Sequence, residues 1–303
     1  MRHESVLVIG GSGFIGSHIV ARLAAEGRRV IVPTRRQSRA RHLQLLPTVQ
    51  VVEADVFDRD TLYRLVPQAD ALINLVGVLH SPAGRPWGPA FERAHVELPR
   101  RLVAACQRHA VKRILHMCAL GADLNGPSMY QRSKAAGEKI MLDAGLEVTS
   151  FRPSVVFGPE DNFLNMFAKL QSVLPVLALG GLKAKFQPVY VGDVAQAFVD
   201  ALDDSRTFGK VYELTGPHVY SMRELLHLTG VYSGHPRPAI GLPDVIARLQ
   251  AFMLEHLPGG PLMSRDNLDS MKSDNIASDQ YPAPPGWYPT PLEAVAPQYL
   301  ARH

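Results

Sequence analysis

The sequence predicts an α/β protein: a doubly wound parallel sheet with a smaller C-terminal α/β subdomain. Three observations lead to this prediction. Short apolar segments rich in β-branched residues alternate with helical segments through the first half of the chain, which is typical of parallel sheets. The first apolar segment runs directly into a glycine-rich turn and an amphipathic helix. After Pro153 the alternation becomes irregular, so the subdomain is expected in the second half.

Six strands are expected in the first half. Residues 6–9 are all apolar, as in a strand buried on both faces. Ile15, Ile19 and Leu23 then recur at helical spacing, and Gly27 suits the end of that helix. Pro99 should kink or restart the helix expected over 91–109. The other expected strands cover 29–33, 49–53, 71–76, 113–117 and 147–151, and a further helix covers 129–144.

The second half is expected to contain shorter elements. Asp193 is predicted to cap a helix that ends at 202, and Ser221 with Glu224 has the spacing of a capping box. The Pro-rich segment 282–291 should be irregular but packed through Trp287 and Tyr288. The remaining expected elements are helices over 163–173 and 244–256 and strands over 189–191 and 211–214. We therefore assign 1–155 with about 186–215 to the sheet domain, and about 156–185 with 216–303 to the subdomain.

The composition is that of an ordinary globular protein. The chain has 303 residues, 46% of them hydrophobic and 20% charged, which excludes disorder, collagen and coiled coil as descriptions of the whole. Two cysteines cannot form a disulfide scaffold, and the scattered histidines predict no metal site. The net charge of +4 predicts no nucleic-acid partner. No apolar run approaches the ~20 residues of a membrane span, and the chain begins directly in a strand, so a cytoplasmic location is expected.

The glycine-rich turn predicts a phosphate site. Gly11, Gly13 and Gly16 have the Gly-x-Gly-x-x-Gly spacing between a strand and a helix, which is the context that gives this weak motif its meaning. Small residues let the backbone approach a pyrophosphate, and the helix N-terminus presents free N–H groups to it. This is the turn of a Rossmann-type dinucleotide fold. The residues expected to bind the cofactor here are Gly10, Gly11, Ser12, Gly13, Phe14, Ile15 and Gly16.

The end of the second strand favours NADP(H) over NAD(H). An NAD site usually has an acidic residue there, but no Asp or Glu occurs between Gly27 and Val52. Thr34, Arg35 and Arg36 follow the strand instead, and a guanidinium suits a 2′-phosphate. NAD(H), or a solvated basic surface with no dinucleotide, remains an alternative. After the third strand, Asp55 and Val56 could contact adenine, and Asp55 could equally cap a turn.

Tyr130 and Lys134 form a candidate acid–base pair. They lie four residues apart on the helix after the fifth strand, hence on one helix face. A neighbouring ammonium is expected to lower the pKa of the tyrosine toward neutrality, and the lysine could also bond the cofactor's ribose. A plain surface pair is the alternative. After the fourth strand, Asn74, Val76 and Gly77 could line the cofactor, or Asn74 could cap a turn.

These motifs together resemble the extended and atypical branch of the short-chain dehydrogenase/reductase superfamily, of the NAD-dependent epimerase/dehydratase type. The segments 116–122, 132–135 with 137–138, 152–159 and 186–195 are further similar to bacterial relatives of the NADPH-binding accessory subunit of mitochondrial respiratory complex I. The resemblance covers essentially the whole chain. It implies contacts from Pro153, Ser154 and Val155 to the nicotinamide amide, and it implies a bound NADP(H) more securely than it implies turnover.

One residue departs from that family's pattern. The third catalytic group of the superfamily is a Ser or Thr at the end of the fifth strand, and Cys118 holds that position here. A thiol is a weaker hydrogen-bond donor than a hydroxyl. Cys118 is therefore either a weak catalytic donor or a small buried filler, and Ser128 is a substitute to be considered.

Two functions from different classes follow. The first is an NADP(H)-dependent oxidoreductase or epimerase-like enzyme in which Tyr130 exchanges a proton with a carbonyl or hydroxyl substrate. The second is a non-catalytic protein that holds the cofactor and is associated with a respiratory or quinone-linked membrane complex, peripherally at the inner face of the membrane. The substrate class, whether carbonyl, sugar nucleotide or quinone-like, rests on the resemblance alone.

Overall fold

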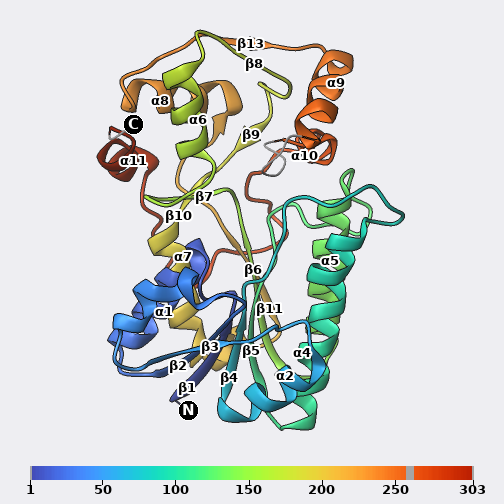
Figure 1. The fold of residues 1–303 in the computed structure, drawn as a ribbon, viewed down its shortest axis with the longest axis vertical. Coiled ribbons are helices and arrows are strands. Elements are labelled where there is room, and N and C mark those ends of the chain that lie inside the picture. Colours follow the sequence, from blue (N-terminus) through green and yellow to red (C-terminus); the bar gives the residue numbers. More distant parts are fainter. Residues whose placement is uncertain (1, 257–262, 302–303) are drawn as a thin grey trace.

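A computed structural model describes residues 2–256 and 263–301 and contains the predicted doubly wound sheet (Figure 1). Seven parallel strands lie in the order β11-β6-β5-β4-β1-β2-β3. Because β1 lies between β4 and β2, the chain winds outward from the centre in both directions. The fold prediction is confirmed. The strands are β1 Ser5–Ile9, β2 Arg29–Thr34, β3 Val49–Glu53, β4 Ala71–Asn74, β5 Arg113–Met117, β6 Glu147–Pro153 and β11 Lys210–Leu214.

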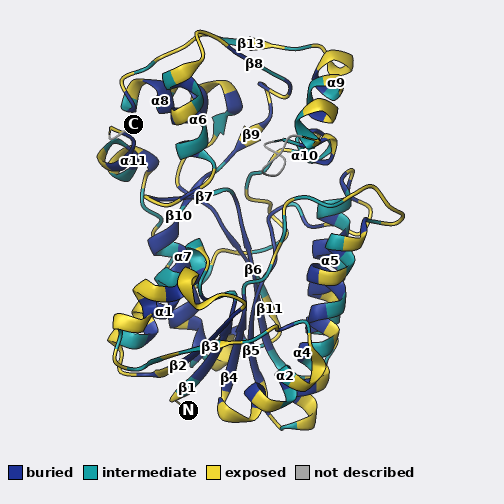
Figure 2. Ribbon diagram, viewed as in Figure 1, coloured by how far each residue is buried: buried dark blue, intermediate teal, exposed yellow. Residues whose placement is uncertain are grey.

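Helices cover both faces of the sheet because alternate residues of each strand point to opposite sides. Val6 and Val8 of β1 belong to the core beneath α1 (Phe14–Ala25) and α7 (Val191–Leu202). Leu7 and Ile9 belong to the second core. That core lies beneath α2 (Arg59–Leu65), α4 (Leu98–Arg108) and α5 (Met129–Leu142). Figure 2 shows the strands buried and the outer faces of these helices exposed.

The helix that precedes β5 changes its winding at its centre. It begins as α3 (Pro89–Phe91), continues as a π-helical segment (Glu92–Glu97), and restarts as α4 with Pro99 in its first turn. The missing N–H of a proline costs nothing in a first turn. The predicted restart at Pro99 is confirmed, and the wide turn before it carries His95.

A second group of elements, here called the upper lobe, lies beyond the carboxyl ends of the strands (Figure 1). It has its own hydrophobic core, which includes Phe157, Phe167 and Leu226. This separate core supports the proposed division into a sheet domain and a subdomain. The lobe contains α6 Leu164–Val173, β8 Leu177–Leu179, β9 Lys185–Phe186, β12 Tyr220–Ser221, α8 Met222–Tyr232, β13 Ala239–Gly241, α9 Asp244–Glu255, α10 Arg265–Ser270 and α11 Leu292–Leu300.

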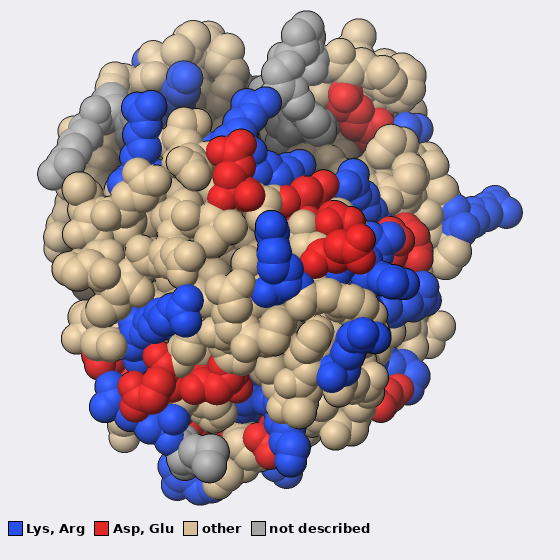
Figure 3. Space-filling model, turned by 60° about the horizontal axis from the view of Figure 1, so that its bottom comes forward, with Lys and Arg blue, Asp and Glu red and all other residues tan. Residues whose placement is uncertain are grey.

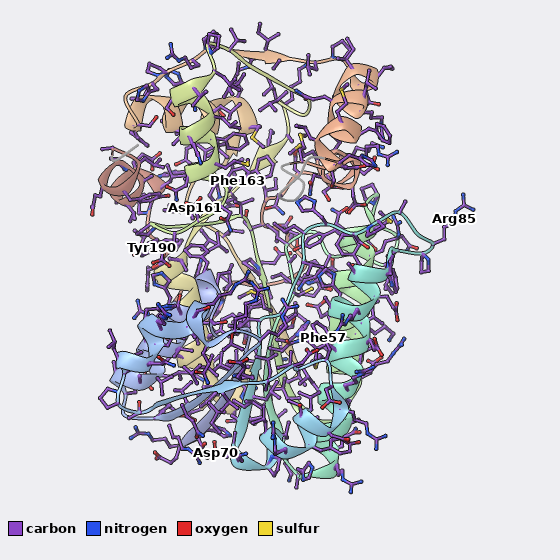
Figure 4. The ribbon with its side chains drawn as sticks, viewed as in Figure 1. Phe57, Asp70, Arg85, Asp161, Phe163 and Tyr190 are labelled. Carbon is purple, nitrogen blue, oxygen red and sulfur yellow. The ribbon has the colours of Figure 1, made fainter. Side chains whose placement is uncertain are left out.

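Short strand pairs and polar contacts join the lobe to the sheet. β7 (Val156–Phe157) pairs in parallel with β10 (Val189–Tyr190) at the junction. Asp161, labelled in Figure 4 near this junction, accepts hydrogen bonds from the backbone of Gly158 at 3.1 Å and from the Tyr299 hydroxyl at 2.8 Å. The Tyr299 contact ties the last helix, α11, to the point where the chain first enters the lobe.

Two expectations for the second half are wrong. Asp193 does not cap α7: the N-cap is Tyr190, and the Asp193 carboxylate accepts hydrogen bonds from the Thr290 backbone at 2.6 Å and hydroxyl at 3.0 Å. Tyr288 does not pack the Pro-rich segment, because it is 90% exposed. Of the two aromatic residues, Trp287 packs there, and it donates to the Thr215 carbonyl at 3.0 Å. The capping box of Ser221 is confirmed.

The surface agrees with a near-neutral composition. On the face drawn in Figure 3, Lys and Arg side chains are interspersed with Asp and Glu. Within residues 2–256 and 263–301, none of the helices has the length and hydropathy required to cross a bilayer, and no cluster of three metal-ligating side chains is found.

Candidate active site

The glycine-rich turn leaves the N-terminus of α1 open. Gly13 is the N-cap of α1 and makes no side-chain capping hydrogen bond, so the first N–H groups of this 12-residue helix remain available for an anion. A Cβ at Gly16 would lie only 2.3 Å from the Gly10 carbonyl oxygen. Gly16 therefore permits the turn itself to fold closely over the start of the helix.

The end of β2 lies beside this turn. The Ser12 hydroxyl is 3.4 Å from the Thr34 hydroxyl, which in turn contacts the Arg36 carbonyl at 3.2 Å. Arg35 and Arg36 are exposed, and among the described residues neither guanidinium has an ion-pair partner. The structure thus places the end of β2, which is followed by these two exposed arginines, beside the glycine turn.

The residues after β3 are taken up by local contacts. Asp55 accepts a hydrogen bond from the Phe57 backbone at 3.0 Å and lies 3.6 Å from the Arg93 guanidinium. These contacts are those of a turn cap, the alternative considered above. Val56 is buried in the second core. In Figure 4, Phe57 lies on the α2–α4 side of the sheet, which is the side of this core.

The segment after β4 connects the glycine turn to α5. Asn74 is fully buried, with its amide 3.2 Å from His116 Nδ1 and its oxygen accepting from the Val76 backbone at 3.3 Å, which is a turn role. A Cβ at Gly10 would contact Leu75 and the Val76 nitrogen. A Cβ at Gly77 would lie 3.7 Å from Lys134 Nζ. Residues 74–77 therefore connect the glycine turn to Lys134.

Tyr130 and Lys134 lie on one face of α5 but make different contacts. Lys134 is buried and donates to the Met117 carbonyl at 2.7 Å. The half-buried Tyr130 has its ring edge-on to Phe91 and His95, and the described residues give its hydroxyl no hydrogen-bond partner. Burial, with Cys118 next, raises the pKa of Tyr130. The expectation of a lowered pKa is wrong for the protein alone, because burial of the phenol raises the value.

A neutral histidine, His95, is linked to Tyr130 through Ser133. His95 Nε2 accepts from the Val78 backbone at 3.0 Å, and its Nδ1 is 2.8 Å from the Ser133 hydroxyl, which donates to the Tyr130 carbonyl at 2.9 Å. Since Nε2 accepts, the proton of the neutral ring is on Nδ1. Burial and then the charge of Lys134 lower the pKa of His95 to about 2. The same causes lower the pKa of His116 to about 3.

Cys118 and Ser128 both contact residues of α5. The Cys118 thiol lies 3.6 Å from the Lys134 carbonyl and packs against Ala122 and Ala135. Burial raises the pKa of this thiol to about 12. Ser128 is wholly buried as the N-cap of α5, where its hydroxyl accepts from Gln131. These contacts favour the filler interpretation of Cys118 and remove Ser128 as a substitute donor.

The end of β6 meets the same site from the other side. The Pro153 carbonyl accepts from the Leu120 backbone at 2.9 Å, and the Ser154 hydroxyl donates to Asn275 Oδ1 at 2.6 Å. Val155 packs against the core of the upper lobe. Asn275, from the segment after α10, thereby holds the residues that the family resemblance places beside the nicotinamide.

A separate polar cavity lies beside α5. Its volume is about 740 Å³, and it is lined by Gln131, Glu138 and Lys139 of α5 but by neither Tyr130 nor Lys134. Glu138 forms a buried ion pair with Arg152, which also stacks on Tyr281. We assign this pair a structural role, because both charges are satisfied within the protein.

The structure therefore gathers most of the predicted residues at one edge of the sheet, around the glycine turn, Gly77 and Lys134. Sequence reasoning missed His95, Ser133, Asn275 and Asp266, a residue of α10 whose carboxylate bonds the first turn of α5. Ser133 lies between Tyr130 and Lys134 in the sequence, so the Tyr-x-x-x-Lys motif could have drawn attention to it. The others come from distant segments, and no spacing relates them to the motif.

The arrangement of these residues can be compared with known proteins. The model of the NAD dependent epimerase/dehydratase family matches residues 6–215. The chain is 36% identical over 290 residues to NADH dehydrogenase (ubiquinone) 1 alpha subcomplex subunit 9, mitochondrial, of Arabidopsis thaliana, covering 90% of this chain and 70% of the relative. It is 31% identical over 307 residues to the Mus musculus protein of the same name, covering 98% and 79%.

Solved structures share the fold. The UDP-glucuronic acid 4-epimerase from Bacillus cereus, in complex with UDP-glucuronic acid and NAD, superposes with a TM-score of 0.71. The two chains are 17% identical, and the match covers 98% of this chain and 99% of the epimerase. At that identity the likeness concerns the arrangement of sheet and upper lobe.

Proposed function

We propose, from the premise that this chain belongs to the NAD-dependent epimerase/dehydratase family, that it binds NADP(H) across the carboxyl ends of β1, β2, β4, β5 and β6. Membership of the family was expected from the sequence motifs and is confirmed. The observation that carries the proposal is that the open N-terminus of α1, Gly77 and Lys134 lie at the same end of the sheet. A Cβ at Gly77 would lie 3.7 Å from Lys134 Nζ.

The residues present fit such a cofactor. The uncapped N–H groups of α1 and the glycine turn would hold the pyrophosphate, and the unpaired Arg35 and Arg36 would hold a 2′-phosphate. Lys134 would hold the nicotinamide ribose. The bound nicotinamide would supply hydride transfer. NAD(H) remains the alternative cofactor, and a test of the choice is given in the Discussion.

On this proposal the chain's own contribution is proton transfer by Tyr130. Burial raises the pKa of Tyr130, so the phenol is protonated at neutral pH and acts first as an acid toward a carbonyl oxygen. Acting as a base would require the Lys134 ammonium to leave the Met117 carbonyl, 2.7 Å away, and approach the phenol, where its charge would stabilise the phenolate.

A test of cofactor binding begins with the protein as purified. Mass spectrometry of a heat-denatured sample should release NADP(H), and added NADPH should raise the melting temperature in proportion to the logarithm of its concentration. NADH at the same concentrations should give a smaller rise. If neither dinucleotide changes the melting temperature and none is released, the proposal is refuted.

A specific observation favours a second candidate, a cofactor-holding subunit of a membrane complex. The two relatives above are named as subunits of NADH dehydrogenase (ubiquinone). Helix α9 places its small residues, Ala247 and Ala251, inward. Its large apolar residues point outward, and the helix is correspondingly exposed in Figure 2. They are Val245, Ile246, Leu249, Phe252 and Met253.

The partner that fits this α9 face is the apolar surface of another protein subunit. The arginines beside it, Arg248 and Arg265, are each paired with carboxylates, so the face offers no surplus positive charge to anionic lipid. Native electrophoresis of gently solubilised host membranes should place the chain with NADH dehydrogenase activity. The double change Leu249→Ser with Phe252→Ser should release it. Turnover of a carbonyl, quinone or sugar nucleotide by a chain that never joins the complex would favour the enzyme.

A further inference from the structure

A carboxylate from the upper lobe reaches the first turn of α5. Asp266 Oδ1 accepts from the Met129 backbone N–H at 2.7 Å, and Oδ2 accepts from the Tyr130 backbone N–H at 3.0 Å. Asp266 is 8% exposed, so the contact is buried. The first N–H groups of a helix lack partners within it, and a negative charge is favourable at this end of the helix dipole.

The Asp266 contact adds to an N-terminal cap of α5 that is otherwise formed by neighbouring residues of the chain. The next N–H, of Gln131, is bonded to the Ser128 hydroxyl at 3.1 Å, and the Gln131 side chain returns a bond to the Ser128 backbone at 3.3 Å. This reciprocal pair is a capping box, which satisfies two of the N–H groups at the start of the helix. The N–H groups of Met129 and Tyr130 are thus satisfied from another part of the molecule, although α5 already has its own cap.

Asp266 is held firmly within the upper lobe. Leu268 of α10 packs against Ala247 and Ala251 of α9. Ion pairs join the two helices further, Arg248 with Asp269 at 2.6 Å and Arg265 with Glu255 at 3.0 Å. Because α9 and α10 form one packed pair, a displacement of this pair relative to the sheet would pull on the first turn of α5 through Asp266.

Lys134, in contrast, is anchored to the sheet domain. Its ammonium bonds the Met117 carbonyl at the end of β5, and a Cβ at Gly137, one turn further along α5, would lie 1.9 Å from the His95 carbonyl oxygen. The middle of α5 therefore packs too closely on the His95 segment to shift independently. Tyr130 is the member of the pair that lies within the turn held by Asp266.

We propose that Asp266 is a positioning residue, which sets the place of Tyr130 relative to Lys134 according to where the upper lobe lies. The proposal rests on the proposed function only in taking Tyr130 and Lys134 as the acting pair. It means that a ligand or partner seated on the upper lobe can reach the acid–base group through one buried carboxylate.

The experiment uses the full chain without cofactor, labelled with 3-fluorotyrosine, so that its outcome does not depend on dinucleotide binding. Tyr130→Phe identifies the fluorine resonance of residue 130. Asp266→Asn keeps the size of the side chain but loses its charge, and Asp266→Ala removes the contact. Asp279→Asn is the control, because Asp279 is an exposed carboxylate outside the α9–α10 pair.

Both Asp266 variants should shift the resonance of Tyr130, while Asp279→Asn leaves it in place. Amide hydrogen exchange at Met129 and Tyr130 should become about tenfold faster in Asp266→Ala, as loss of a helix cap permits, with Gln131 and the amides of α9 unchanged. If Asp266→Ala fails to fold, Asp266→Asn decides the result by the same two measurements. An unshifted resonance together with unchanged exchange at Met129 and Tyr130 would overturn the proposal. A failure to bind NADPH would count against the proposed function alone.

Discussion

At the scale of single residues, the site combines exposed cations with a buried one. Arg35 and Arg36 are exposed and have no ion-pair partner among the described residues, so their charges are available to a ligand. Lys134 is buried, and burial lowers its pKa even though Cys118 and Glu138 act in the other direction. The exposed arginines are therefore suited to discriminating between NADPH and NADH, and the buried lysine is suited to contacting the nicotinamide ribose.

The first prediction concerns that choice. Replacing Arg35 and Arg36 together by Ala should remove the preference for NADPH while leaving NADH affinity nearly unchanged. A charged hydrogen bond contributes roughly 1.5–3 kcal/mol, so the preference should be about ten- to hundredfold. Calorimetric titration with both dinucleotides measures it. Arg29→Ala, at the other end of β2, is the control. Equal affinity of the unaltered protein for the two dinucleotides would contradict the prediction.

The second prediction separates the roles of the acid–base pair. Lys134→Met should weaken NADPH binding, because the lysine lies beside Gly77 at the cofactor end of α5. Tyr130→Phe should leave affinity almost intact and abolish any turnover. Lys139→Met serves as control, since Lys139 is exposed and pairs with Asp143. The assignment is wrong if Lys134→Met and Tyr130→Phe have the same effect on the dissociation constant.

At the scale of elements, the ends of helices are stabilised by residues far away in sequence. Two of the first N–H groups of α5 are bonded by Asp266 of α10. The last carbonyls of α7 are bonded by Arg113 of β5, a fully buried arginine that donates to the Leu202 carbonyl at 3.0 Å and to the Ala201 carbonyl. Each such bond fixes a helix to a particular strand or helix, and so determines its position.

The third prediction is that Arg113→Met strongly destabilises the fold. Besides α7, the guanidinium donates to the Glu147 carbonyl at 2.8 Å and to Thr149 and Thr207. Its removal leaves several buried acceptors unpaired, at roughly 1–3 kcal/mol each, so a loss of about 3 kcal/mol or more is expected in urea unfolding. Arg206→Ala, at an exposed ion pair, should change stability by less than about 1 kcal/mol. Equal effects of the two changes would refute this account.

At the scale of the whole molecule, a few polar clusters join segments that pack separately. Asp203, just after α7, accepts bonds from the His3 backbone at 2.9 Å and from Arg28 at 2.8 Å. It thereby links the start of the chain, the start of β2 and the end of α7. Burial tends to raise the pKa of Asp203, but the bonds from Arg28 and His3 outweigh it and lower the value to about 2.

The fourth prediction is an acid-dependent loss of stability through this cluster. A carboxyl group with a lowered folded-state pKa stabilises the fold above its ordinary value of 3.8, and this contribution disappears as the pH falls from 3.8 toward 2. Asp203 is partly exposed, so we discount the contribution to about 1 kcal/mol. Asp203→Asn should lower the unfolding free energy at pH 7 and make little difference near pH 2. A gap of the same size at both pH values would contradict the linkage.

The glycine turn, the strands of the sheet and the Tyr130–Lys134 spacing were determined by the sequence alone. Each depends on residues within about fifteen positions of one another, where backbone geometry and side-chain period decide the outcome. The helix that begins after Ser221 likewise follows from a local hydroxyl and carboxylate. Local patterns of this kind also carried the family resemblance.

Only the tertiary structure decided what surrounds those motifs. In the folded chain the Cys118 thiol lies near the Lys134 carbonyl, and Asp193 bonds Thr290 instead of capping a helix. Tyr288 is exposed to solvent. His95, Asn275 and Asp266 lie at the site although they come from distant segments. A buried polar atom takes whichever partner the packing brings within about 3 Å. When that partner comes from a segment more than a hundred residues away, as Asp266 does for Tyr130, no local pattern in the chain encodes the pairing.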